Sequence, residues 1–410
     1  MITENDRQVL RRLAGQAREI ADLPEMTERR RRLYDLNALR PDRPVVLCFP
    51  EGAWGELLPE EVLQCQDRLL RGWEMKLRQR LYWWEHIRDD NTLEPTFDLN
   101  WVVNIGDHGF AIENIRSEAR GSYRWTPPVQ DLQRDMSKLH FRPLSVDRQE
   151  TLRRLALAEE AFGDLLQVKL GGSFWWTLGL TWEVIKLIGL EPLMLAMLDE
   201  PDRLHQLMAW MRDEHMHFID WLEQEGLYTI NNRNGYVGSG GVAYTDQLPQ
   251  GDWQPGQPVR TIDLWGFAES QETVGISPAM FGEFVFPYQL PLLARFGLNC
   301  YGCCEAVHAR WSFIRQIPRL RRVSVSPWAD QRSMVEHLGG SYVFSRKPNP
   351  SPVCVGFNES VIRQDLRSTL DIARGLPVEI ILKDTHTVQN QPERLSRWTA
   401  IAREEVERRI

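Results

Sequence analysis

The most chemically concentrated stretch of the chain is NCYGCCEAVH, residues 299 to 308, with three of the six cysteines, a glutamate and a histidine. All three residue types are good zinc ligands. A β-strand alternates its faces, so Cys303 and Cys304 can turn to one side only where the strand has ended. Three uses stay open for the pair: metal ligands, buried thiols without a ligand, or a redox pair. A disulfide between these adjacent residues would be strained, which disfavours it.

A second polar stretch, LKDTHT at residues 382 to 387, follows an apolar, β-branched run. A histidine after a strand suits a metal ligand or an acid–base group, and a neighbouring carboxylate can orient it. We therefore predict Cys303, Cys304, Glu305 and His386 as a zinc site. The predicted catalytic residues are His386, Asp384 and Glu305.

The expected substrate-binding residues also follow apolar runs. Arg346 and Lys347 form a cationic pair that suits an anionic group, although a salt bridge to Glu305 or Asp330 accounts for them equally well. Aromatic side chains at other strand ends suit the lining of an apolar pocket. The remaining residues predicted to contact substrate are Glu51, Trp54, His108, Trp175 and Trp265.

Short apolar runs alternate with longer helical patterns along the chain. This alternation predicts about eight βα units, which favours an α/β (β/α)8 TIM barrel over a doubly wound sheet. The barrel is expected over residues 41–410, after an N-terminal helical extension over residues 1–40. In such a barrel the chemistry lies where strands end and loops begin. The predicted strands are 44–49, 97–104, 166–172, 227–232, 298–302, 321–326, 341–346 and 378–384.

Two further segments carry local predictions. Residues 277–297 have the pattern of one helix, with Ser277 as N-cap and Pro278 at the first helical position. Residues 235–246, GYVGSGGVAYTD, are glycine-rich but lack the context of a nucleotide-binding loop. We predict a mobile loop over the barrel mouth there.

Composition narrows the class of protein. The 410 residues are 42% hydrophobic and 26% charged, with a net charge of −8. No basic block suits nucleic acid, and neither a signal peptide nor a membrane span is expected. We expect a cytoplasmic protein that acts on a small molecule, without nucleic-acid or membrane partners. In a reducing compartment, clustered cysteines favour metal binding or chemistry over disulfides.

The segment LWGFAESQETVGISPAMFGEFVFPYQLPLLARFGL, residues 264–298, resembles the uroporphyrinogen decarboxylase-like superfamily, as does the run from Cys303 to Pro350. The resemblance covers roughly residues 40–405 and implies a TIM barrel. True decarboxylases of that superfamily carry an arginine-rich segment after strand one. This chain has PVVLCFPEGAW there, with Glu51 and no arginine.

The zinc-dependent, corrinoid-linked methyltransferases of the superfamily are the favoured branch. They carry His-x-Cys-Gly after strand five and a Cys after strand eight, where this chain has YGCCE and KDTHT. The resemblance implies methyl transfer between a small substrate, such as a methoxylated aromatic compound, and a corrinoid carried by a partner protein. The alternative is a metal-independent decarboxylase or lyase of the same fold, with Arg346 and Lys347 on a carboxylate and His386 as the acid.

Overall fold

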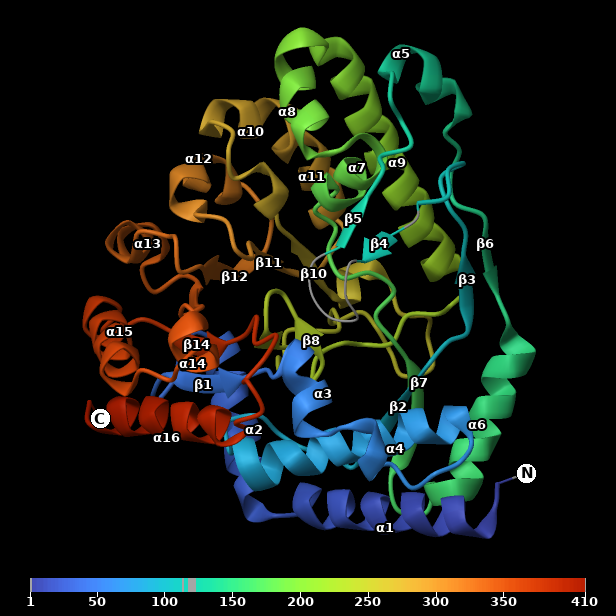
Figure 1. The fold of residues 1–410 in the computed structure, drawn as a ribbon, viewed down its shortest axis with the longest axis vertical. Helices are drawn as coiled ribbons and strands as arrows, with labels where there is room; N and C mark the ends of the chain where they lie inside the picture. Colours follow the sequence, from blue (N-terminus) through green and yellow to red (C-terminus); the bar gives the residue numbers. More distant parts are fainter. Residues whose placement is uncertain (1, 113, 117–122, 410) are drawn as a thin grey trace.

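The computed structural model describes residues 2–112, 114–116 and 123–409 (Figure 1). Its main feature is a six-stranded parallel sheet in the order β1-β14-β13-β12-β11-β10. A separate parallel ladder pairs β2 with β7. The eight strands are β1 (Val45–Cys48), β2 (Thr96–Asn100), β7 (Gln167–Gly171), β10 (Trp265–Ala268), β11 (Leu298–Tyr301), β12 (Leu320–Val325), β13 (Val343–Arg346) and β14 (Val378–Leu382).

Helices alternate with the strands of the large sheet and surround it (Figure 1). This order is compatible with a TIM-barrel-like fold, but strand pairing among the described residues does not close the two ladders into one barrel. The surrounding helices are α7 (Thr181–Ile188), α8 (Leu190–Asp199), α9 (Pro201–Gln224), α10 (Pro278–Phe284), α11 (Phe286–Leu293), α12 (Trp311–Ile314), α13 (Gln331–Leu338), α14 (Ser351–Cys354), α15 (Glu359–Ile372) and α16 (Glu393–Glu407).

The fourth strand is β10 and not the predicted segment 227–232. That segment lies between β7 and β10, where side chains replace ladder hydrogen bonds. The Thr229 hydroxyl donates to the Leu170 carbonyl at 2.8 Å, and the Asn231 carboxamide bonds both the amide and the carbonyl of Trp265, at 2.9 and 3.3 Å. We call this discontinuity the β7–β10 seam.

A second discontinuity, the β1–β2 seam, lies beside β1. Two consecutive aspartates occupy the place of a neighbouring strand there: Asp90 accepts from the Val46 amide at 2.9 Å and Asp89 accepts from the Cys48 amide at 2.8 Å. The backbone amide of Asp90 also donates to the Val46 carbonyl at 2.9 Å. The two carboxylates thus accept hydrogen bonds from the backbone amides at the edge of β1, which a neighbouring barrel strand would otherwise bind.

The segment 277–297 forms two helices, whereas one was predicted. Ser277 caps α10 as expected, accepting from the Met280 amide at 3.2 Å. The chain leaves helical geometry at Val285, with φ −120° and ψ −60°, and α11 then begins beside Pro287. Pro287 has no amide hydrogen to donate to the preceding turn, so one helix cannot continue undisturbed from α10 through this position, which explains the break.

The N-terminal region packs on the β2–β7 ladder. Helices α1 (Glu4–Ala21) and α2 (Pro24–Asn37) precede β1, and α1 contacts α4 (Arg68–Tyr82) and α6 (Arg148–Phe162). Apolar side chains of α1, α4 and α6 share one buried cluster with Phe97 and Leu99 of β2. Smaller elements are α3 (Trp54–Leu57), α5 (Leu132–Asp135) and two antiparallel strand pairs, β3 (Val103–Ile105) with β6 (Leu144–Val146) and β4 (Asn114–Arg116) with β5 (Tyr123–Trp125).

The glycine-rich segment is a buried hairpin, which corrects the prediction of a mobile loop. Its strands are β8 (Tyr236–Val237) and β9 (Gly241–Val242), and residues 237–245 are all buried. Gly238 and Gly240 have φ values of +67° and +94°. A Cβ on Gly240 would lie 2.9 Å from Cγ2 of Ile381 in β14. Glycine is needed here for close packing against the sheet.

Across the described ranges, no helix combines the length and the apolar composition needed to cross a bilayer. Helix α9 is long, but charged residues recur along it.

Candidate functional site

The parallel strands place their carboxyl ends at one edge of the sheet, and the two predicted polar stretches meet there. Strand β11 ends at Tyr301, and Gly302 follows with φ +90°, which turns the chain out of the strand. After this turn the sulfurs of Cys303 and Cys304 lie 3.6 Å apart. The turn removes the strand alternation that would have put the two side chains on opposite faces.

Cys303 is the buried member of the pair, with 3% of its surface exposed. The Ser239 hydroxyl donates to its sulfur at 3.3 Å, and the Lys383 ammonium does so at 3.5 Å. The Cys304 thiol, the Lys383 charge and the Ser239 hydroxyl all favour the thiolate. They lower the pKa of Cys303 to about 7, although burial acts in the opposite direction.

Lys383 connects the thiol to the acidic side of the site. Its ammonium donates to the Ser239 hydroxyl at 3.0 Å and lies 3.6 Å from the Asp384 carboxylate. Burial alone would lower the pKa of Lys383, but the negative charges around it raise the pKa above its ordinary value. Lys383 is therefore a permanent cation beside a titrating thiol.

Cys304 and Glu51 lie on the solvent side of this group. Cys304 is half-buried, and its sulfur is 3.8 Å from the Asp384 carboxylate. Proximity to the Cys303 thiolate and burial raise the pKa of Cys304, so it stays protonated. Glu51 accepts from the Asp384 amide at 2.7 Å, and burial raises its pKa.

Glu305 has a different role from the predicted ligand and catalyst. One carboxylate oxygen accepts from the Ser270 amide at 2.9 Å, and the other accepts from the Cys303 amide at 2.9 Å. Glu305 therefore holds the turn that carries the cysteines. Nearby Glu269, which was not in the predicted catalytic set, is fully buried and has one oxygen without a hydrogen-bond partner. Burial raises its pKa well above the ordinary value, which keeps it neutral.

A cavity of about 770 Å³, here called the large cavity, lies at the β7–β10 seam. Such a volume is typical of a small-molecule site. Tyr236, Val237 and Gly238 of the hairpin line it, and the next residue, Ser239, contacts Cys303. The charges of Lys383 and Cys303 also act on Tyr236. The predicted residues Trp175 and Trp265 lie here, in an aromatic lining that also includes Phe174, Trp176, Tyr228, Trp253, Phe267 and Phe296.

The predicted zinc ligands do not assemble into one site. Both oxygens of Glu305 bind backbone amides, and His386 is exposed and packs over Gly52, where a Cβ would lie 3.0 Å from its Nδ1. Lys383 beside Cys303 also opposes a divalent cation. Among residues 2–112, 114–116 and 123–409, no three Cys, His, Asp or Glu side chains are placed to hold a metal ion. The present donor set does not fit zinc.

Several predicted substrate contacts lie away from the large cavity. Arg346 points to the outside of the sheet, where it donates to the Ser326 carbonyl at 2.8 Å and pairs with Asp365 at 3.0 Å. Lys347 is buried on the opposite face of the sheet, where its ammonium donates to Ser345. Burial lowers the pKa of Lys347 to about 7. Adjacent strand residues point to opposite faces, so the expected cationic pair cannot form.

The last two predicted contacts are also separate from the thiols. His108 packs against Trp210, with ring centroids 5.4 Å apart, and burial lowers its pKa to about 4. Trp54 packs edge-on against Tyr82 and Trp83. Asp384 contacts Lys383 and Cys304, so its carboxylate is engaged with the sulfur group.

Comparison with known proteins agrees with an α/β fold built on parallel strands. The chain is similar in structure to a methyltransferase from Methanosarcina mazei, with a TM-score of 0.53. Sequence identity is 13%, and the match covers 92% of this chain and 98% of the other. At this identity the likeness establishes a shared fold. No protein-family model and no curated protein matches the sequence. Membership of the uroporphyrinogen decarboxylase-like superfamily stays a prediction.

Proposed function

We propose that the protein is a methyltransferase that removes a methyl group from a small methoxylated aromatic substrate in the large cavity. The observation that carries this proposal is the buried Cys303 thiol at the carboxyl end of the parallel sheet, with the Ser239 hydroxyl 3.3 Å and the Lys383 ammonium 3.5 Å from its sulfur, groups that lower its pKa. The aromatic lining of the neighbouring cavity suits such a substrate. The fold shared with a methyltransferase gives further support.

In the proposed reaction the bond between the ether oxygen and the methyl carbon breaks, and the oxygen keeps the electron pair. A reduced corrinoid on a partner protein is the proposed methyl acceptor, and it would supply the electron pair of the new bond. The Cys303 thiol gives its proton to the departing oxygen and becomes a thiolate. Lys383 and the Ser239 hydroxyl stabilise that thiolate. A proton donor with a pKa near the working pH is efficient in this role.

The positions of the other residues favour this scheme over the lyase alternative. Arg346 and Lys347 were expected to hold a carboxylate, but Arg346 pairs with Asp365 and Lys347 is buried beside Ser345. No step is assigned to zinc, because Glu305 and His386 do not join the two sulfurs. The superfamily membership and the corrinoid carrier belong to the proposal.

The test is methyl transfer from methoxylated aromatics, with guaiacol as the first probe and free reduced cobalamin as acceptor, followed by ¹³C NMR of the labelled methyl group. The wild type should transfer the label, and Cys303→Ser should lower the rate by about 100-fold or more. Cys354→Ser makes the same chemical change at another buried thiol and should retain the rate.

Two outcomes contradict the proposal: no transfer by the wild type from any methoxylated aromatic in the panel, or an unchanged rate in Cys303→Ser. Elemental analysis of the same preparations measures whether zinc is bound. Stoichiometric zinc that is lost in both Cys303→Ser and Cys304→Ser would restore a metal site at the sulfurs and replace the proton-donor role.

A further inference from the structure

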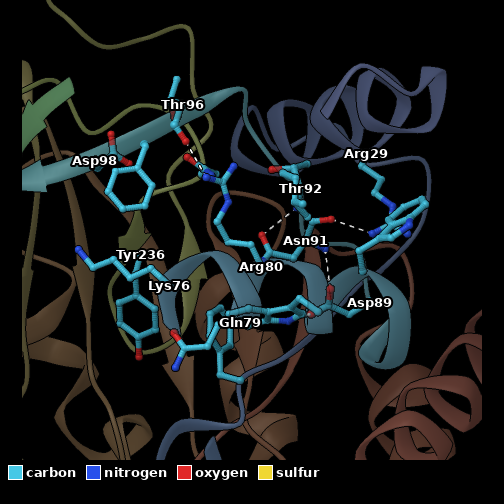
Figure 2. A pocket seen from close by; sticks show the side chains of 16 residues that line it. Arg29, Lys76, Gln79, Arg80, Asp89, Asn91, Thr92, Thr96, Asp98 and Tyr236 are labelled. Atoms are coloured by element: carbon cyan, nitrogen blue, oxygen red, sulfur yellow. Dashed lines mark hydrogen bonds between the residues drawn. The ribbon is translucent and has the colours of Figure 1, made fainter. Parts of the chain in front are cut away.

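A second cavity of about 390 Å³, here called the small cavity, lies at the β1–β2 seam and is separate from the thiol group. Its volume falls in the range of small-molecule sites. Aromatic rings form much of its wall, namely Phe49, Trp83, Trp84, Phe97 and Tyr236. Tyr236 also lines the large cavity, so one side chain borders both. Figure 2 shows Lys76 and Asp98 at one end of the small cavity, Arg29 and Asp89 at the other, and Arg80 between them.

The charges at the two ends differ in how they are satisfied. Arg29 pairs with Glu25 at 2.7 Å and donates to the Asn91 carbonyl at 2.8 Å. Asp89 accepts from the amides of Cys48 and Asn91, at 2.8 and 2.9 Å. That end of the cavity therefore has no free charge to offer a ligand.

The other end holds two cations without a bound carboxylate. Arg80 donates to the backbone carbonyls of Thr96, at 2.6 Å, and Glu94. Within the described residues, Lys76 makes no hydrogen bond or ion pair, and its ammonium lies 5.9 Å from the centroid of Phe97. Arg80 is half-buried, and burial lowers its pKa, which the charge of Asp98 offsets in part; the Lys76 side chain is exposed. Neither cation is hydrogen-bonded to a carboxylate, and their two positive charges outnumber the single charge of Asp98, which favours an anionic ligand.

We propose that the small cavity binds a flat aromatic carboxylate, with the carboxylate between Lys76 and Arg80 and the ring against the aromatic wall. Arg80 is already oriented by two carbonyls, so little side-chain entropy is lost when the ligand binds. Lys76 supplies the mobile second charge. Asp98, the carboxylate at this end, disfavours a dianion and so favours a single negative charge. This site does not depend on the proposed reaction at Cys303.

The experiment is isothermal titration calorimetry of the full chain with 2-naphthoate and with its neutral analogue, 2-naphthamide. The wild type should bind 2-naphthoate saturably and more tightly than 2-naphthamide. Lys76→Met, which keeps much of the side-chain length and removes the charge, should weaken 2-naphthoate binding at least 10-fold. Binding of 2-naphthamide should be the same in both proteins, which excludes a general loss of folding as the cause.

Lys169→Met is the matched control, because Lys169 lines the large cavity and not the small one. It should leave 2-naphthoate binding unchanged. The proposal is overturned if the wild type does not bind 2-naphthoate, if Lys76→Met binds it as tightly as the wild type, or if the loss occurs in Lys169→Met instead.

Discussion

The buried face of the large sheet and the carboxyl ends of its strands both hold buried charged groups, but these groups have different partners. In the interior, Arg322 pairs with Glu379 at 2.8 Å and donates to Asn37 at 2.8 Å and to the Val242 carbonyl at 3.0 Å. Arg322 has 2% of its surface exposed and Glu379 none. Together with the bonds from Arg322 to Asn37 and Val242, this pair ties the hairpin and α2 to the sheet.

At the carboxyl end the permanent cation Lys383 faces a thiol that can titrate. The pKa of Cys303 lies near neutrality, so this group exists in two charge states under ordinary conditions. Burial alone therefore does not mark a functional charge. A functional charge is also poised between two protonation states next to a cavity.

The largest expected effect is on the interior pair. Glu379→Ala leaves the Arg322 guanidinium buried without its partner and should lower the free energy of unfolding by about 3–5 kcal/mol. Urea denaturation followed by circular dichroism measures this loss. Glu359→Ala removes an acidic residue that pairs with Arg397 at the surface and should leave stability nearly unchanged. An equal loss of unfolding free energy in the two variants would refute the distinction between the buried pair and the surface pair.

A smaller loss of stability is expected at the hairpin. Gly240→Ala places a methyl group against Ile381 at a left-handed backbone position and should lower the free energy of unfolding by about 1–3 kcal/mol. Gly235→Ala is the matched control, since a Cβ there meets nothing within 4 Å. If thermal melting shows the two variants to be alike, the hairpin does not pack inside the sheet as described.

The smallest expected effect is a shift in pH dependence at the carboxyl end. If Cys303 acts as the proton donor, the rate of methyl transfer falls as pH rises through about 7, because the thiol loses its proton. Lys383→Met removes the cation that favours the thiolate, so the pKa of Cys303 should rise. The pH at which the rate of methyl transfer falls should then be about one pH unit higher. The pH–rate profile measures the shift. Lys186→Met, at the half-buried pair with Glu183, should show the wild-type profile.

The alternation of strands and helices predicted most of the sheet from sequence. The strand-end rule placed the cysteine pair and the 382–387 stretch at one edge of the sheet, where the Cys304 sulfur lies 3.8 Å from the Asp384 carboxylate. The fourth strand was misplaced because the residues of 227–232 resemble those of a strand. In the structure the hydrogen bonds of this segment across the β7–β10 seam are made by side chains, such as that of Asn231, and not by the backbone. Local sequence could not tell that Gly240 serves packing instead of mobility. Arg346 was assigned to the wrong face of the sheet. Side chains alternate between the two faces along a strand, so an error of one residue in the alternation moves a side chain to the opposite face.

The most direct test of the central claim is the pH titration of the Cys303 thiolate by its ultraviolet absorbance, taken as wild type minus Cys303→Ser. The structure predicts a thiolate that appears with a midpoint near pH 7. A midpoint at or above the ordinary thiol value of 9 would contradict the account, because Cys303 would then be an inert buried thiol.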